Sequence, residues 1–373
     1  MPDRLSQFLN DRIEAGDFPS AVYLVADKGE IVLQNALGSS VVEPERIEAK
    51  PDTIYDVASL TKVLITGLLI AKLVESGEIQ LDARVCIYLK EFETEGKRMI
   101  TVADLLTHTS HLPAWKPLYL FASSRSEVIN EIGKTSLKYE QDAVTYSDLN
   151  FIALGTLIER FAGKSLNEAA SESLFSPLGL KNTSFTPAAH VKHRIAASER
   201  GNAYERQISI EQGCLQPAGG SDTHSAFRTD VIWGEVHDGN AYFMGGVAGH
   251  AGLFSTAEEI FKIAQQFLPR YASLLKPETC EVFCSNFTPG MNEHRAFAFQ
   301  LASTPDSTAG SKMSPESFGH LGFTGTSLWI DPVKERIFVL LTNRTHNHAL
   351  PFANINAVRR EFHDLAIDLL EKN

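Results

Sequence analysis

Apolar residues near the start of the chain change from helical to strand-like spacing and back again. Residues 3–15 carry apolar side chains three and four positions apart, which predicts an amphipathic helix. Residues 22–33 alternate between apolar and polar around a turn at 27–29, which predicts a β-hairpin. A short extended run then leads to Ser59, and the strongly apolar stretch 60–76 predicts a helix. Ser59 is therefore expected at the start of a helix.

The middle of the chain, roughly 78–240, shows little strand-like alternation. Loops containing Pro, Gly and Ser separate stretches of helical spacing, so we expect a mostly helical region. The helices predicted there cover 102–107, 147–162 and 166–174.

Strand-like spacing returns in the last third of the chain. A helix comes first, opened by a capping signal at Ser255 or Thr256. Strands are then predicted over 319–330 and 337–341, and the second is apolar at every position, as in a strand covered on both faces. Apolar residues at steps of three and four predict a closing helix over 353–370.

Strands at both ends of the chain, with helices between them, predict an α/β fold of the α+β kind. We expect one antiparallel sheet flanked by helices, built from residues 1–77 and 241–373. A mostly helical domain, 78–240, would be inserted between the two halves. The predicted cleft lies where the two domains meet.

Composition narrows the class of protein. The chain has 34 basic and 46 acidic side chains among 373 residues and a net charge of −12. Such a surface repels phosphate backbones and anionic lipids, so neither nucleic acid nor a membrane is an expected partner. No apolar run could span a bilayer, and none near the N-terminus resembles a secretion signal. We expect a cytoplasmic protein, or a periplasmic or extracellular one if a leader has been removed.

Four cysteines in a chain of this length do not resemble the disulfide framework of a secreted protein. Cys280 and Cys284 are four positions apart, as on one helix face, and we expect two buried thiols.

The sharpest local signal for chemistry is Ser59-Leu60-Thr61-Lys62 at the predicted helix start. Residues three apart share a helix face, so the Lys62 amine can reach the Ser59 hydroxyl. A serine hydroxyl becomes a good nucleophile only when a neighbouring group takes its proton. The helix N-terminus also directs backbone N–H groups at any oxyanion formed above Ser59.

A Ser-x-x-Lys pattern alone is weak, because about one match is expected by chance in a chain of this kind. Ser273-Leu274-Leu275-Lys276 is a second match, but Pro277 follows it and no helix is predicted there to hold the pair. For an isolated pattern, an ordinary helix start is the default interpretation.

Two further motifs accompany the first one. Tyr146-Ser147-Asp148 lies at a predicted helix start, and His320-Leu321-Gly322 lies on a late predicted strand. In order and approximate spacing the three motifs resemble the serine β-lactamase and penicillin-binding superfamily. The resemblance is closest to class C β-lactamases, D-alanyl-D-alanine carboxypeptidases and family VIII-type esterases, and it implies a β-lactamase/transpeptidase-like fold. Supporting segments are Tyr55-Asp56-Val57-Ala58, Leu105-Leu106-Thr107-His108-Thr109-Ser110, Pro177-Leu178-Gly179-Leu180 and the glycine-rich stretch 245–252.

The resemblance implies a catalytic group of three residues. Ser59 would be the nucleophile that forms an acyl-enzyme, and Lys62 the neighbour that accepts or relays its proton. Tyr146 would be a second base. Its phenol, with an ordinary pKa of about 10, works near neutral pH only if cations such as Lys62 favour the phenolate. Without the other motifs, Tyr146 would be interpreted as a half-buried aromatic residue.

The same resemblance places His320-Leu321-Gly322 on the strand beside the nucleophile. Gly322 would let the substrate backbone approach closely. The backbone N–H of Phe323 would join that of the nucleophile in an oxyanion hole. His320 is expected to supply a hydrogen-bond donor or a positive charge there, and the alternative is a solvent-facing histidine at a strand start.

Three positions depart from the family pattern. Leu321 replaces a threonine that helps to hold a substrate carboxylate in β-lactamases and carboxypeptidases, and leucine cannot donate that hydrogen bond. Asp148 replaces an asparagine; as a carboxylate it only accepts hydrogen bonds, and we expect it to pair with Lys62. His111 stands where the pattern has glycine, so the sequence does not decide the backbone conformation of the local turn.

Other candidates carry less weight. His108, His111, His346 and His348 lack the spacing of a metal site, so we expect neither a metal nor a cofactor. The stretch 245–252 lacks the ending of a phosphate-binding loop, and we expect a tight loop at the rim of the cleft. The remaining candidates are Trp115, Tyr119 and Phe121 as cleft walls or core residues, and Arg344 as a carboxylate clamp.

The sequence therefore predicts a cofactor-independent serine hydrolase that acts through acylation of Ser59 and deacylation by water. The substrate would be a peptide or small molecule with a peptidoglycan-type amide, a β-lactam or a carboxylic ester. The alternative is a non-catalytic member of the same fold that only binds peptides or muropeptides.

Overall fold

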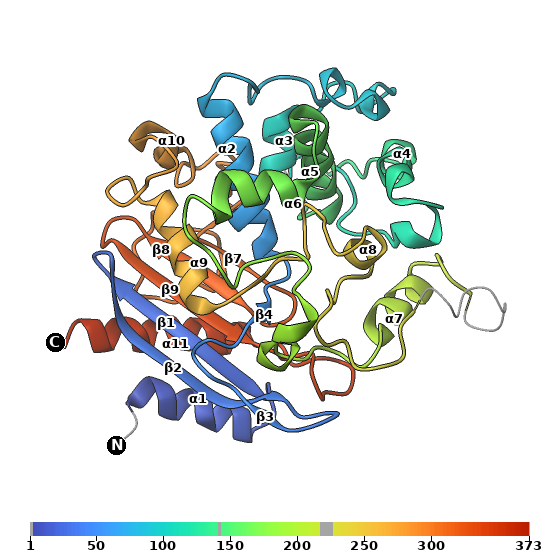
Figure 1. Cartoon of the computed structure of the whole chain (residues 1–373). Coiled ribbons are helices and arrows are strands. Elements are labelled where there is room, and N and C mark those ends of the chain that lie inside the picture. Colours follow the sequence, from blue (N-terminus) through green and yellow to red (C-terminus); the bar gives the residue numbers. More distant parts are fainter. Residues whose placement is uncertain (1–2, 141–142, 217–226, 373) are drawn as a thin grey trace.

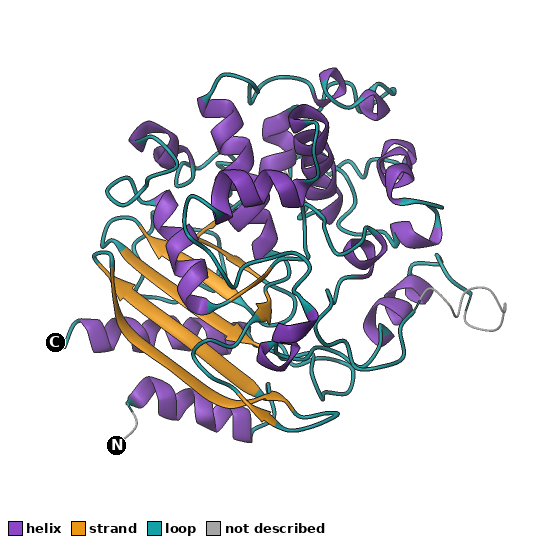
Figure 2. Cartoon of the chain, in the orientation of Figure 1, coloured by secondary structure: helices purple, strands orange, loops and turns teal. Residues whose placement is uncertain are grey.

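The computed structural model describes the whole chain except residues 1–2, 141–142, 217–226 and 373. Its central element is a seven-stranded sheet in the order β3-β2-β1-β9-β8-β7-β6, antiparallel throughout (Figures 1 and 2). The two ends of the chain meet in this sheet, because β1 pairs with β9. The strands are β1 (Ser20–Asp27), β2 (Glu30–Val41), β3 (Ile47–Glu48), β6 (Gln300–Leu301), β7 (Phe318–Leu321), β8 (Ser327–Asp331) and β9 (Arg336–Thr342). The predicted fold class is confirmed.

The apolar run in β9 explains why this strand lies near the centre of the sheet. Ile337, Val339 and Leu341 point into one apolar cluster, whereas Phe338 and Leu340 point into another on the opposite face. Because successive side chains of a strand point to opposite faces, only a strand covered on both sides buries all five.

Two terminal helices cover one face of the sheet (Figure 1). They are α1 (Arg4–Glu14) and α11 (Asn356–Leu370), as the helical spacing at each end predicts. Asp3 caps α1 by accepting a hydrogen bond from the N–H of Ser6 at 2.8 Å. The apolar stripes of both helices pack on the sheet around Trp329.

The opposite face is covered by α9 (Ala257–Ala264) and by helices of the middle region. A short ladder joins β4 (Tyr55–Asp56), just before Ser59, to β5 (Phe254–Ser255). One apolar cluster runs from this face of the sheet into the helical region, and the domain boundaries near 78 and 240 stay a prediction. The remaining helices are α2 (Leu68–Glu75), α3 (Val102–Thr107), α4 (Val128–Lys134), α5 (Asp148–Ala162), α6 (Leu166–Ala170), α7 (Ala203–Glu211), α8 (Gly239–Phe243) and α10 (Pro277–Val282).

The helix predicted after Ser59 is present, with a wider first part than expected. Residues 62–67 form a π-helix, which continues directly into α2. Such wide turns are rare and often lie at functional sites.

Of the two predicted capping residues, Thr256 caps α9, because the backbone of Ser255 pairs with Tyr55 in the β4–β5 ladder. The prediction for the second Ser-x-x-Lys match was wrong. A helix does follow the second Ser-x-x-Lys match: α10 begins at Pro277, since proline is well suited to a first helical position. Lys276 precedes that helix and therefore does not share a helical face with Ser273.

The expectation of two buried thiols holds for one of them. Cys280 is 2% exposed, whereas Cys284 is half-buried because α10 ends before it. The turn at His111 keeps a glycine-like shape, since His111 adopts a φ of +60°.

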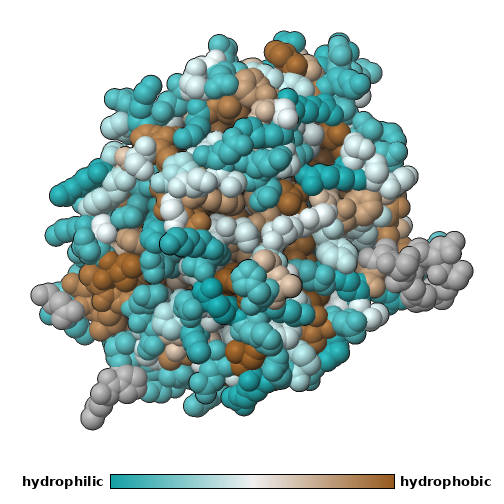
Figure 3. Space-filling model, in the orientation of Figure 1, coloured by the Kyte–Doolittle hydropathy of each residue, from teal (hydrophilic) through white to brown (hydrophobic). Residues whose placement is uncertain are grey.

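Polar side chains cover most of the face shown in Figure 3, and apolar ones form separate patches between them. No helix in the described residues is both long and apolar enough to cross a membrane. The compartment stays a prediction.

Candidate active site

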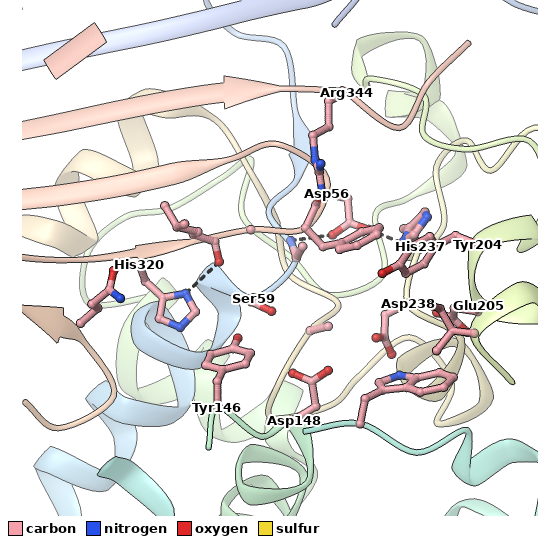
Figure 4. Close-up of a pocket in the computed structure, with 18 of the residues that line it drawn as sticks. Asp56, Ser59, Tyr146, Asp148, Tyr204, Glu205, His237, Asp238, His320 and Arg344 are labelled. Carbon is pink, nitrogen blue, oxygen red and sulfur yellow. Dashed lines mark hydrogen bonds between the residues drawn. The ribbon is translucent and has the colours of Figure 1, made fainter. Parts of the chain in front are cut away.

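The residues of the three motifs meet in one cleft at the junction of sheet and helical region (Figure 4). Its volume is about 670 Å³. The turn before α2, the end of β7 and the start of α5 form its walls, and α7 closes one end. The motif residues that line it are Ser59, Tyr146, Asp148, His320, Leu321, Gly322 and Phe323.

A strained turn presents Ser59 to the cleft. Ala58, directly before it, has a φ of +48°, which L residues other than glycine rarely adopt. The Asp56 carboxylate holds this turn by accepting hydrogen bonds from the N–H groups of Ala58 (2.9 Å) and His237 (2.7 Å). Burial raises the pKa of Asp56, and the two N–H donors partly offset that effect.

Lys62 is fully buried one turn after Ser59. Its Nζ donates hydrogen bonds to Ser59 Oγ at 2.8 Å and to the His250 carbonyl oxygen at 3.1 Å, and it lies 2.7 Å from Asp148 Oδ1. Burial acts to lower the pKa of Lys62, but Asp148 and Tyr146 raise it, and the net change is upward. Lys62 is therefore an ammonium ion at neutral pH, a state that cannot accept a proton.

Tyr146 approaches the nucleophile from the side opposite the sheet (Figure 4). Its ring centre lies 5.0 Å from Lys62 Nζ. Burial raises the pKa of Tyr146, and this outweighs Lys62 and the hydrogen bonds from Lys62 and Ser59, which act to lower it. The net upward shift of the pKa of Tyr146 favours the phenol over the phenolate in the resting site, and the part of Tyr146 as a second base stays a prediction.

Two glycines bring the helix that carries Asp148 close to Lys62. A Cβ on Gly155 of α5 would lie 2.9 Å from the backbone of Gly249, so neither position has room for a side chain. The same loop supplies the His250 carbonyl oxygen that accepts from Lys62. Of the stretch 245–252, Ala251 lines the cleft, as expected for a loop at its rim.

The β7–β8 hairpin is joined to the nucleophile turn by two threonines. Thr324 Oγ1 donates to the Asp56 carbonyl oxygen at 2.8 Å, and Thr326 Oγ1 donates to that of Val57 at 2.9 Å. A Cβ on Gly322 would collide with Thr326 Oγ1 and crowd the Val57 oxygen. Glycine is thus required here for the contact between hairpin and turn, a reason that differs from the expected approach of substrate.

Two backbone N–H groups are free to bind an oxyanion. The N–H groups of Ser59 and Phe323 donate no hydrogen bond to another described residue, and both residues line the cleft. This is the pair that the resemblance implies. Its use in catalysis stays a prediction.

His320 is buried and neutral, so the expectations of a positive charge and of a solvent-facing ring were wrong. Its Nδ1 lies 2.9 Å from the carbonyl oxygen of Leu321, which can only accept, and Nδ1 therefore carries the hydrogen. The pKa of His320 is lowered well below its ordinary value by burial and by the charges of Lys62 and Arg295. The Nε2 atom has no partner among the described residues and is an acceptor.

Arg295 is a cleft residue that sequence reasoning missed. It is 4% exposed, and its Nη2 lies 2.9 Å from Glu293 Oε1. Nε and Nη1 have no hydrogen-bond partner within the described part of the chain. The guanidinium lies 5.4 Å from the ring centre of Tyr146. No sequence signal marks it, because residues 283–299 form an irregular segment without periodicity.

Arg344 also lines the cleft, but its donors are used differently from the clamp expected of it. Nε donates to the Phe323 carbonyl oxygen at 2.8 Å, and Nη1 donates to that of Ala353 at 2.7 Å. These bonds fix the backbone beside the proposed oxyanion hole.

The end of the cleft opposite His320 is acidic and aromatic, and sequence reasoning missed its two carboxylates, Glu205 and Asp238 (Figure 4). Burial, followed by the charge of Asp238, raises the pKa of Glu205 to about 7. Burial also acts to raise the pKa of Asp238, but His250, 2.9 Å away, lowers it on balance. Trp115 also lines the cleft.

The other two aromatic candidates face elsewhere. The Tyr119 hydroxyl donates to Glu205 at 2.9 Å, whereas the Phe121 side chain is 44% exposed and its ring lies beside Lys116. Neither lines the cleft.

Asp148, Asp238 and His250 bring possible cation ligands within 4.8 Å of one another. The Lys62 ammonium already lies 2.7 Å from Asp148, so a positive charge is present in this group. The expectation of no metal stays a prediction.

The chain belongs to the beta-lactamase family, whose model matches residues 5–360. It is 33% identical to a putative D-alanyl-D-alanine carboxypeptidase of Salmonella typhimurium, over 94% of this chain and 84% of the relative. A protein of the same description from Escherichia coli is 29% identical, over 92% of this chain and 82% of the relative.

Solved structures confirm the fold. A class C beta lactamase from Rhodobacter sphaeroides has a TM-score of 0.71 and 18% identity, covering 98% of this chain and 99% of the other. EstCE1, a hydrolase with promiscuous acyltransferase activity, has a TM-score of 0.73 and 18% identity over 97% of both chains. A penicillin-binding protein homologue from Pyrococcus abyssi has a TM-score of 0.73 and 20% identity, covering 98% of this chain and 77% of the other.

Proposed function

We propose that the protein is a serine hydrolase that cleaves an amide or ester bond through a Ser59 acyl-enzyme. One observation carries the proposal: the Lys62 ammonium donates to Ser59 Oγ at 2.8 Å inside a cleft with two free backbone N–H groups. The family of the chain and the descriptions of its relatives support the class of reaction.

The charge states of the resting site favour a proton relay through Tyr146. Ser59 Oγ attacks the carbonyl carbon while its proton passes to the Tyr146 oxygen, and the phenolic proton of Tyr146 passes to the leaving group. The Ser59–carbon bond forms, the bond to the leaving group breaks, and Tyr146 begins and ends as a phenol. Lys62 stabilises the developing negative charge on Ser59 Oγ. Water then releases the acyl group through the reverse relay.

We further propose that preferred substrates carry a carboxylate beyond the scissile bond. Leu321 offers no donor to such a group, but the unpartnered Nε and Nη1 of Arg295 do, from the wall beside Tyr146. The relatives described as carboxypeptidases are consistent with this substrate class. A hydrogen bond to a charged group contributes about 1.5–3 kcal/mol, which corresponds to roughly 10- to 150-fold in kcat/KM.

The test compares a peptide ending in D-Ala-D-Ala with the same peptide carrying a C-terminal amide. The wild type should prefer the free acid, and Arg295→Gln should lose that preference by roughly 10- to 150-fold while its rate on the amide changes little. Glu293→Gln is the matched control, because it removes the partner of Arg295 but keeps the guanidinium. Equal rates on acid and amide in the wild type would contradict the carboxylate proposal alone.

The broader proposal is tested with nitrocefin, short-chain p-nitrophenyl esters and the peptides. Ser59→Ala should lose turnover of every substrate that the wild type cleaves. If the wild type cleaves none of them and Ser59→Ala binds peptides as well as the wild type does, the protein is a binding module and the proposed function is wrong.

A further inference from the structure

His108 has no assigned part in the reaction, yet it contacts the chain on both sides of Tyr146. Its carbonyl oxygen accepts a hydrogen bond from the N–H of Thr145 at 3.0 Å, and its Nδ1 accepts one from the N–H of Ser147, also at 3.0 Å. Its ring centre lies 4.6 Å from that of Tyr146. One residue therefore holds the backbone before and after Tyr146 and also supports its ring.

The surroundings of His108 fix its orientation and its protonation state. The Asn150 amide nitrogen lies 3.3 Å from Nδ1, and Ser110 Oγ holds that amide by donating to its oxygen at 2.6 Å. With Ser147 N–H as a donor, Nδ1 is the acceptor and Nε2 carries the hydrogen. Burial and the nearby charges of Arg295 and Lys62 lower the pKa of His108 well below its ordinary value. A neutral ring keeps this acceptor.

The backbone of His108 is shaped for this contact. The residue ends α3 with a φ of +61°, a left-handed conformation that turns the chain directly after the helix. Phe151 packs on the imidazole as well, with its ring centre 5.2 Å away. The imidazole is completely buried between Tyr146 and Phe151 and does not line the cleft. It therefore acts on substrate only through its neighbours.

We propose that His108 is the positioning residue for Tyr146: its Nδ1 holds the Ser147 N–H so that the Tyr146 hydroxyl stays within reach of Ser59 and the leaving group. This inference rests on the proposed function, since it requires Tyr146 to relay a proton. A displacement of about 1 Å in such a group can cost about a hundredfold in rate.

The experiment separates loss of the acceptor from loss of the ring. His108→Phe keeps an aromatic ring but removes the acceptor, and His108→Ala removes both. His108→Asn keeps an acceptor oxygen close to the position of Nδ1, and asparagine tolerates the left-handed conformation. The acylation rate with a chromogenic ester should fall about 10- to 100-fold in the Phe and Ala variants and stay within about threefold of wild type in His108→Asn.

His111→Phe is the matched control. His111 has the same left-handed φ, and its ring contacts Tyr139 at 4.9 Å, outside the cleft. The acylation rate of His111→Phe should remain within about twofold of that of the wild type. Thermal unfolding midpoints identify variants that are folded at the assay temperature, and rates are compared only among those. If neither His108→Phe nor His108→Ala is folded, His108→Leu replaces them: a roughly 10-fold loss in it beside an unaltered rate in His108→Asn supports the proposal, and equal rates in the two variants contradict it.

A double-mutant cycle with Tyr146→Phe tests whether His108 acts through the phenol. Tyr146→Phe alone should reduce acylation by about 10²- to 10⁴-fold. Adding His108→Phe should then cost less than about twofold, because the hydroxyl to be positioned is gone. Additive losses would overturn the positioning role while leaving the proposed function intact. An unchanged rate in Tyr146→Phe itself would instead overturn the relay.

Discussion

Asp148→Asn is the substitution that most directly tests how charge is balanced behind Ser59. The change preserves shape but removes the carboxylate 2.7 Å from Lys62 Nζ. The Lys62 side chain is 0% exposed, so its ammonium group stays out of contact with bulk water when the carboxylate is gone. Removing one member of a buried ion pair typically destabilises a protein by about 3–5 kcal/mol. We expect the variant to lose this much free energy of unfolding at neutral pH.

The loss should depend on pH with a definite sign. In the wild type the pKa of Lys62 is raised, so the stabilisation by the pair is complete below the pKa of an unfolded lysine, about 10.4, and is lost as the pH rises through the higher folded pKa. In Asp148→Asn the largest effect that raises the pKa of Lys62 is removed and only Tyr146 opposes burial, so we expect this pKa to fall below the unfolded value. The penalty is then greatest at and below neutral pH and shrinks as the pH approaches about 10.

Urea unfolding of both proteins at several pH values between about 6 and 10 measures this difference. Glu172→Gln is the control, because Glu172 and Lys164 form an exposed pair whose side chains are 64% and 35% exposed. Such a surface pair contributes at most about 1 kcal/mol. If Asp148→Asn is no less stable than Glu172→Gln at pH 7, or if its deficit does not change with pH, the account of charge balance is wrong.

Three further outcomes are expected. Gly322→Ala should lower the free energy of unfolding by about 1–3 kcal/mol and slow acylation, since the added Cβ collides with Thr326. The control Gly163→Ala adds its Cβ in open space and should cost only the strain of its positive φ. Chemical denaturation measures the stability of both variants, and the chromogenic ester assay measures their acylation rates. A thiol reagent should label Cys284 well before Cys280, whose pKa is raised to about 11 by burial, and equal labelling rates would contradict this. His363→Phe should reduce the loss of stability on acidification. Burial lowers the pKa of His363 to about 3, so below about pH 6.5 the unfolded state takes up a proton that the folded state does not. Unfolding titrations from about pH 7 to about pH 4 measure how steeply the free energy of unfolding falls with pH in each protein.

Much of the fold followed from local patterns. The all-apolar run of β9 predicted a strand covered on both faces. Apolar residues three and four positions apart predicted α1 and α11, because this spacing places them on the one face of a helix that is buried. The sequence offered two equivalent capping signals for α9, and a tertiary contact, the pairing of Ser255 with Tyr55, decided between them.

The candidate site was predictable only where chemistry is local in sequence. Ser59 and Lys62 lie on one helix face, so their contact follows from spacing. Arg295 and Asp238 come from loops that only the folded chain brings to the cleft, and no periodicity marks them. The resting phenol of Tyr146 was also beyond the sequence, because it depends on burial opposing the charges around it.

The central claim concerns a covalent bond to one oxygen atom, and intact mass spectrometry with an acylating probe tests it most directly. After incubation with a fluorophosphonate or a labelled penicillin, the wild type should gain the mass of a single adduct, and peptide mapping should locate it on Ser59. The Ser59→Ala variant should gain none. An adduct of equal yield in Ser59→Ala, or a wild-type adduct located on another residue, would contradict the account.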